Sequence, residues 1–446
     1  MPGTSEYLLA PILPRTGQLL CVLNLDYAAL PRVNVVKWER ITKQIIDLVR
    51  CKWGMNTIVL DIVNTISGLP CAVLEVRNDS CRYNKQGLYP TDIDHITEEL
   101  LDAETRKSLE SIRNGEITQR GPFSRVGWVD EAASWIVASL GQSTRTINCD
   151  IDQFNASGHF ALVRFSDTRG TSVWLKAVGV PNEHEFEVTL ALSECVGDYL
   201  PTVIAMRRDW NAWLMEDAGH DIDPSDDQQV ESAIHNLARL QRASIPHIGR
   251  FRTAGCSEQN LRVLNGSVPQ IINYLDEAMS LQTSHKVAPL SSRRLFEIGA
   301  ILQAACDRME TLGIPDTLIH NDINPGNILV DGERCLFTDW SEGHIGNPFL
   351  TFQQLRVQVF RDDPKGTRAG YCEQLYRLHW RDLLCDSDID RAFAMVPALA
   401  VLSYLYGRGN WLNSSGRRDP ESQSYSRSLA RHLDRAVNDP ALLRSI

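Results

Sequence analysis

The chain has 446 residues, of which 43% are hydrophobic and 23% charged, and it carries a net charge of −11. This length is enough for two or three domains with their own hydrophobic cores. Residues 141–342 hold 16 basic against 28 acidic residues, a net of −12, which disfavours nucleic acid as a partner because phosphate backbones bind basic surfaces.

The N-terminal segment lacks the basic start and the long apolar core of a signal peptide. No apolar run approaches the roughly 18 residues that span a membrane. The 11 cysteines are scattered, and no two form a C-x-x-C pair, so we expect reduced thiols and no zinc site. These features predict a cytoplasmic protein that binds no membrane.

Residues 1–125 are expected to form a separate small α/β domain. Apolar runs at 19–27, 57–63 and 69–76 predict strands. Between the first two runs, an amphipathic helix is predicted to stop at Gly54, and a second helix is predicted to stop at Gly115. Residues 118–128, with two glycines and a proline, then read as a linker to a further helix at 130–141.

This strand–helix–strand order faintly resembles a Nudix hydrolase domain. That family's active helix carries a glutamate-rich box ending in E-E-x-G. Aligned on Gly54, the three carboxylate positions fall at Leu48, Cys51 and Lys52. The resemblance therefore implies a degenerate domain without the metal-binding box, and an unrelated α/β domain is the alternative. Its expected role is packing within the chain or binding a protein partner.

Residues 126–219 are predicted to contain an antiparallel sheet. The first turn, NASGHF, holds Gly158, which would let backbone amides approach phosphates. Lys176 lies in a later apolar strand, where its amine needs an anion. The helix that follows offers Glu185, with Glu183 as the second choice, to pair with that lysine. WLMEDAG then reads as a hinge whose backbone, from Glu216 to Ala218, could bind an adenine edge.

The sequence LIHNDINPGNILV, followed by LFTDW, carries the strongest chemical signal. Asp322 is placed to accept a hydroxyl proton, and Asn327 and Asp339 are candidate ligands for Mg²⁺. His320 is expected to support the loop backbone, and Asn324 to brace the loop, with a substrate contact as its alternative. Residues from Pro348 onward read as helices throughout.

These motifs resemble the aminoglycoside phosphotransferase family, which includes choline-kinase-like enzymes, over residues 141–446. The departures are Asn321, where the family often has glycine, and Asn324, where it often has histidine. The resemblance implies an α+β, two-lobed protein-kinase-like fold with an antiparallel-sheet N-lobe (126–219) and a helical C-lobe (220–446). It also implies ATP or another NTP, Mg²⁺, and a small-molecule hydroxyl substrate bound among the C-terminal helices.

Two alternatives stay open: a non-catalytic nucleotide-binding regulatory module and a protein kinase. The short run from Asp339 to Pro348 leaves little room for the activation segment of a protein kinase. Trp380 and Trp411 are candidate walls of the substrate pocket, and the acidic runs near Asp221–Asp227 and Asp386–Asp390 read as solvated surface. A substrate with at most one or two positive charges is therefore favoured over a polycationic aminoglycoside.

Overall fold

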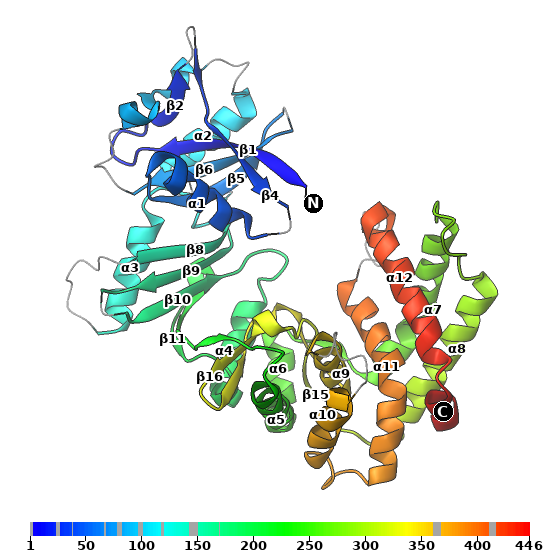
Figure 1. The fold of residues 1–446 in the computed structure, drawn as a ribbon. Coiled ribbons are helices and arrows are strands. Elements are labelled where there is room, and N and C mark those ends of the chain that lie inside the picture. The colour runs from blue at the N-terminus through cyan, green and yellow to red at the C-terminus, as the bar shows by residue number, and fades with distance from the viewer. Residues whose placement is uncertain are drawn as a thin grey trace. The chain divides into compact units, whose positions relative to one another are not determined.

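A computed structural model describes this chain, and Figure 1 shows it as a ribbon. The described residues are 3–23, 27–37, 39–66, 68–77, 83–96, 101–116, 120–141, 150–168, 170–359, 367–409 and 416–446. They divide into two compact units. Unit 1 is Met1–Phe186 with Val203–Asp217, and unit 2 is Glu187–Thr202 with Ala218–Ile446. One crossing between the units falls inside the segment predicted as a hinge.

Unit 1 begins with a mixed seven-stranded sheet of order β3-β2-β1-β6-β5, in which β4 also pairs with β1 and β7 with β2. The strands are β1 Thr4–Ile12, β2 Leu19–Leu23, β3 Ala28–Ala29, β4 Arg32–Val36, β5 Thr57–Asn64, β6 Pro70–Val76 and β7 Tyr89–Thr91. The sequence prediction missed β1, the strand that joins both halves of the sheet. Its last six residues are all buried, so the alternation that marks a half-exposed strand is absent.

Two helices cover opposite faces of this sheet. Helix α1 (Ile41–Trp53) packs on the face that carries Leu9, whereas α2 (Ala103–Asn114) packs on the face that carries Leu8. Both helices end at the predicted glycines, Gly54 and Gly115, in the left-handed conformation. The chain thus has the α/β sheet expected before the kinase-like part, and nothing in the structure tests the Nudix resemblance.

A second, five-stranded antiparallel sheet completes unit 1, in the order β11-β12-β10-β9-β8. Its elements are β8 Asp150–Ala156, β9 Ala161–Ser166, β10 Ser172–Ala177, β11 Val203–Arg207 and β12 Ala212–Glu216, preceded by α3 Trp128–Ser139. Helix α4 (Glu185–Val196) lies between β10 and β11 in the chain. One continuous apolar cluster contains residues of both sheets, so residues 1–125 and the second sheet share a core.

Unit 2 is mainly helical, as predicted for the C-lobe. Its helices are α5 Asp227–Ser244, α6 Ile248–Ala254, α7 Leu261–Ser280, α8 Ser292–Glu310, α9 Pro348–Val359, α10 Thr367–Leu378, α11 Asp386–Arg408, α12 Pro420–Val437 and α13 Pro440–Ser445. Two small sheets accompany them: β13 (His220–Asp221) with β16 (Ile328–Asp331) and β17 (Arg334–Phe337), and β14 (Ser257–Gln259) with β18 (Gly343–Gly346) and β15 (Thr317–His320). These sheets hold the loop that carries Asp322.

Helix α11 qualifies the expectation of no membrane-length apolar segment. Within the described residues, Asp386–Gly407 is long and apolar enough to cross a membrane by length and composition alone. However, 56% of that window is buried inside the protein, where α11 packs against α9, α8 and α12. A single helix of this kind is weak evidence for a membrane span, because a core helix has the same composition.

Candidate phosphotransfer site

Lys176 and Glu185 form an ion pair inside unit 1. Lys176 lies on β10, with β9 and β12 on either side, and its Nζ donates to Glu185 Oε1 at 2.5 Å. Glu185 is the first residue of α4, and its side chain is 2% exposed. The geometry therefore selects Glu185 over Glu183 as the lysine's partner. A buried carboxylate that orients a strand lysine is the arrangement that kinase-like folds use at the α- and β-phosphates.

Gly158 has a steric role that the sequence did not reveal. A Cβ atom built on it would lie 1.6 Å from the carbonyl oxygen of Arg120, in the segment predicted as a linker. Glycine is needed here because the chain's own backbone passes directly over the turn between β8 and β9. Its predicted role, an approach to nucleotide phosphates, stays a prediction.

The loop after β15 is braced by its own side chains. Asn324 Oδ1 accepts from the amide of Gly326 at 2.9 Å, and its Nδ2 donates to the carbonyl of Asp322 at 3.0 Å. Asn327 Nδ2 donates to the same carbonyl at 2.8 Å and to Asp322 Oδ2 at 3.2 Å. The bond from Asn327 orients the partly exposed Asp322 carboxylate, and the other bonds hold the loop backbone. They also leave Asn327 Oδ1 as the amide atom suited to a cation.

His320 joins this loop to the segment that carries Asp339. The imidazole is 1% exposed, its Nε2 is 2.9 Å from the carbonyl oxygen of Thr338, and its Nδ1 accepts from the amide of Asp322 at 3.2 Å. Because a carbonyl only accepts, Nε2 carries the proton and Nδ1 is the acceptor. His320 thus lies beneath the loop, which agrees with the supporting role predicted for it.

Asp339 comes directly after Thr338, and its backbone is in the left-handed conformation, with φ at 63°. Few residues other than glycine adopt this region, although aspartate is among those enriched there. The amide of Thr338 donates to the carbonyl of Asn327 at 3.0 Å, which links the residue before β16 to the segment after β17 and so keeps the backbones of the two candidate Mg²⁺ ligands close together. An amide oxygen and carboxylates are hard oxygen donors, so this set fits Mg²⁺.

A buried amide network behind Asp322 was not predicted. Asn321 Nδ2 donates to Gln259 Oε1 at 2.7 Å, and Ser403 Oγ donates to the same oxygen at 3.1 Å. A Cβ on Gly407 of α11 would lie 2.6 Å from Asn321 Nδ2 and 2.8 Å from Gln259 Nε2. The one sequence signal was a glycine near the end of a strongly apolar helix, which often marks close packing.

The candidate substrate pocket needs a correction. Trp380 is completely buried against Phe349 and Tyr376, so it belongs to the core and cannot form an open pocket wall. Trp411 lies outside the described residues. A cavity of about 520 Å³ is instead found between α5 and α10.

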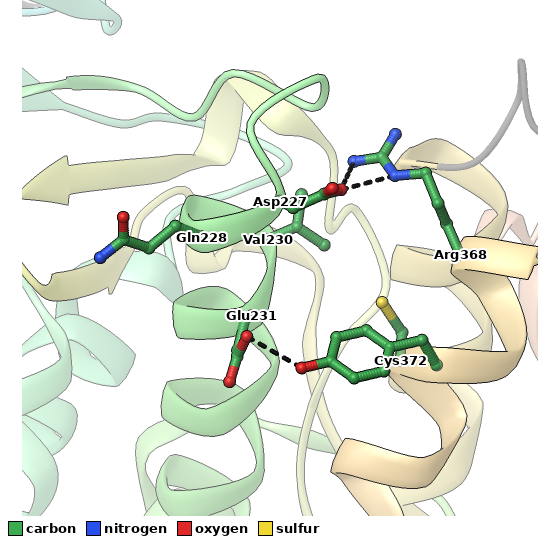
Figure 2. Close-up of a pocket in the computed structure, with 7 residues that line it drawn as sticks. Asp227, Gln228, Val230, Glu231, Arg368 and Cys372 are labelled. Atoms are coloured by element: carbon green, nitrogen blue, oxygen red, sulfur yellow. Dashed lines mark hydrogen bonds and ion pairs between the residues drawn. The ribbon is translucent and has the colours of Figure 1, made fainter.

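Two pairs of polar side chains line this cavity. Figure 2 shows Asp227 facing Arg368, with 2.6 Å between carboxylate oxygen and guanidinium nitrogen. The hydroxyl of Tyr371 donates to Glu231 Oε2 at 3.2 Å. The acidic residues of α11 behave similarly, since Asp390 pairs with Arg377. Carboxylates of both acidic runs are thus engaged with the chain's own hydrogen-bond donors.

Comparison with known proteins places this site in a family context. Residues 181–352 match the model of the phosphotransferase enzyme family, APH, a range that includes Glu185, Asp322, Asn327 and Asp339. The resemblance seen in the motifs is thereby confirmed over this segment, and the match supports phosphoryl transfer as its class of chemistry. No curated protein matches the sequence.

Solved structures with similar folds include kinases of small molecules. An ethanolamine kinase of Plasmodium vivax is 12% identical, with a TM-score of 0.47, over 71% of this chain and 91% of that one. A choline/ethanolamine kinase family protein of Mesorhizobium loti is 14% identical, with a TM-score of 0.47 over 71% and 97%. A macrolide 2'-phosphotransferase of Brachybacterium faecium is 14% identical, with a TM-score of 0.44 over 70% and 98%.

Proposed function

We propose that this protein transfers the γ-phosphoryl group of ATP to a hydroxyl group of a small molecule. The observation that supports it most is the braced loop of unit 2. There, Asn327 holds the Asp322 carboxylate, and His320 ties the loop to the segment of Asp339. Unit 1, taken by itself, holds the Lys176–Glu185 pair, the arrangement that kinase-like folds use to contact nucleotide phosphates.

In this proposal Asp322 accepts the proton of the substrate hydroxyl as the oxygen attacks the γ-phosphorus, while the bond from that phosphorus to the β–γ bridging oxygen breaks and ADP leaves. Asn327 and Asp339 would hold Mg²⁺, which offsets the charge that develops on the phosphate oxygens. Lys176 would contact the α- and β-phosphates, and the backbone of Glu216 to Ala218 would bind the adenine edge.

The acceptor is proposed to be a hydroxyl compound with few positive charges. A polycationic aminoglycoside needs several carboxylates without other partners, because every buried cation must be paired. Within the described part of the chain, Asp227, Asp388 and Asp390 already pair with arginines. Purified protein assayed with kanamycin should therefore show a kcat/KM below about 10,000 per molar per second, the lower end for ordinary enzymes.

The decisive test is the Asp322→Asn variant with a panel of hydroxylated amines and sugars as acceptors. Asparagine keeps the size of the side chain and removes the proton acceptor. Turnover should fall by about 100- to 10,000-fold, the usual contribution of a general base, whereas binding of Mg-ATP should persist. Near-parental turnover with a verified acceptor would sink the assignment.

A further inference from the structure

The N-terminal α/β domain contacts the second sheet at one turn in particular. Residues 157–160 join β8 to β9, and the amide of Ser157 donates to the carbonyl of Phe160 at 3.0 Å. In kinase-like folds, the corresponding first turn of the sheet covers the nucleotide phosphates. Its conformation in this chain depends on a segment outside the sheet, residues 120–124, which we name the strap.

The strap and the turn touch backbone to backbone. The amide of Phe123 donates to the carbonyl of Gly158 at 3.2 Å. A Cβ on Gly121 would lie 2.2 Å from that carbonyl oxygen and 2.6 Å from His159 Nδ1, and a Cβ on Gly158 would lie 1.6 Å from the carbonyl oxygen of Arg120. Two glycines from distant parts of the chain therefore allow one close contact, and neither can gain a side chain without moving the other segment.

The strap is anchored firmly at both of its ends. Ser124 Oγ donates to Asp61 Oδ2 of β5 at 2.7 Å, and the Arg120 guanidinium lies 3.4 Å from the same oxygen. Phe123 is 2% exposed and packs edge-to-face against Trp128 and Trp210, with centroid distances of 5.1 and 5.4 Å. The strap thus links the α/β domain to the second sheet through buried contacts.

A second contact holds the strand that leads into the turn. The side chain of Gln153 on β8 pairs with the backbone of Val59, donating to its carbonyl and accepting from its amide, both at 2.8 Å. Gln153 is 3% exposed. Val59 lies on β5, an edge strand, beside the register shift between Val59 and Asp61. The side-chain amide of Gln153 therefore takes the place of a neighbouring strand, because it hydrogen-bonds the backbone N–H and C=O of Val59.

From these contacts we propose that the N-terminal domain sets nucleotide affinity, with the strap as the positioning element that holds the 157–160 turn. The proposal rests on the proposed function, because the turn matters only if phosphates bind beneath it. It gives residues 1–125 a task within the enzyme that requires no chemistry of their own. Gly121, Asp61 and Gly158 are the positioning residues.

The test compares two substitutions that strain the backbone alike. Gly121 and Gly115 both have positive φ, 81° and 71°, but a Cβ on Gly115 meets nothing within 4 Å. Calorimetry measures the Kd of Mg²⁺ with the non-hydrolysable ATP analogue AMP-PNP. Gly121→Ala should raise this Kd by about two- to tenfold, the range for one lost hydrogen bond. Gly115→Ala should leave the Kd unchanged, although its backbone strain lowers the Tm.

Hydrogen exchange gives a second readout, since Gly121→Ala should speed exchange at residues 157–160 and Gly115→Ala should not. If Gly121→Ala fails to fold, Asp61→Ala loosens the strap without backbone strain and should raise the Kd in the same way. Equal Kd values for these variants and the parent would overturn the proposal. Lys176→Ala separates the proposed function from the proposed role of the strap. If Lys176→Ala no longer binds AMP-PNP while the strap variants bind it like the parent, the role of the strap is refuted and the proposed function is not. A parent that binds no nucleotide overturns both.

Discussion

Replacing Gly407 by alanine probes whether the buried amide network holds the loop of Asp322. Alanine normally stabilises a helix interior by about 0.5–1 kcal/mol relative to glycine. At this position the new Cβ would lie 2.6 Å from Asn321 Nδ2 and 2.8 Å from Gln259 Nε2. Both amides are held by the network with Ser403, so neither moves away without losing a hydrogen bond.

Gly266 offers the matched control, because it lies inside α7 and a Cβ there meets nothing within 4 Å. At Gly407, in contrast, the added Cβ overpacks the amide network, and overpacking costs about 1–3 kcal/mol. The free energy of unfolding should therefore rise by about 0.5–1 kcal/mol for Gly266→Ala, as for any exposed helical glycine. Gly407→Ala should be less stable than this control by about 1–3 kcal/mol, the overpacking cost alone. Denaturant unfolding of both variants measures the difference.

Turnover supplies the second half of this prediction. Asn321 precedes Asp322, so a shift of its side chain moves the proton acceptor, and a misplacement of about 1 Å costs about 100-fold in rate. We expect kcat to fall strongly in Gly407→Ala and to be unchanged in Gly266→Ala. If the two variants have equal stabilities and equal kcat values, the network does not position Asp322.

Three further predictions concern metal, pH and the N-terminal domain. Asp339→Ala should weaken Mg-ATP binding in calorimetry more than Asn327→Ala, because it removes a charged ligand, and parental binding would make Asp339 a structural residue. Burial, with the nearby charge of His235, lowers the pKa of His379 from 6.5 to about 4. Between pH 4 and 6.5 the unfolded chain therefore binds more protons than the folded chain does. The free energy of unfolding should drop by about 1–2 kcal/mol as the pH falls from 6.5 to 4, after allowance for solvent screening. An equally steep drop in His379→Gln would contradict this. The purified chain should hydrolyse no nucleoside diphosphate derivative, since Leu48, Cys51 and Lys52 stand where a metal-binding box would need glutamates, and robust pyrophosphohydrolase activity that persists in Asp322→Asn would overturn this.

Local spacing in the sequence determined the loop of the candidate site. Asp322, Asn324 and Asn327 lie within six residues, and their side chains hydrogen-bond within that span. The ends of α1 and α2 were also determined by the local sequence, because a glycine in the left-handed conformation, here Gly54 or Gly115, ends a helix whatever the helix packs against. The Lys176–Glu185 pair also spans a short distance, nine residues along the chain. Interactions of this range leave a pattern in the sequence.

Tertiary packing decided the features that the sequence did not reveal. Gln259 meets Asn321 across 62 residues and Ser403 across 144, separations at which no spacing rule applies. The sequence predicts Trp380 as a pocket wall, because sequence alone does not distinguish a tryptophan buried in a core from one at a surface. The contact of Gly158 with the strap leaves no pattern in the sequence, because the two segments lie far apart in the chain. Each outcome depends on which distant segments pack together, and this is a property of the fold as a whole.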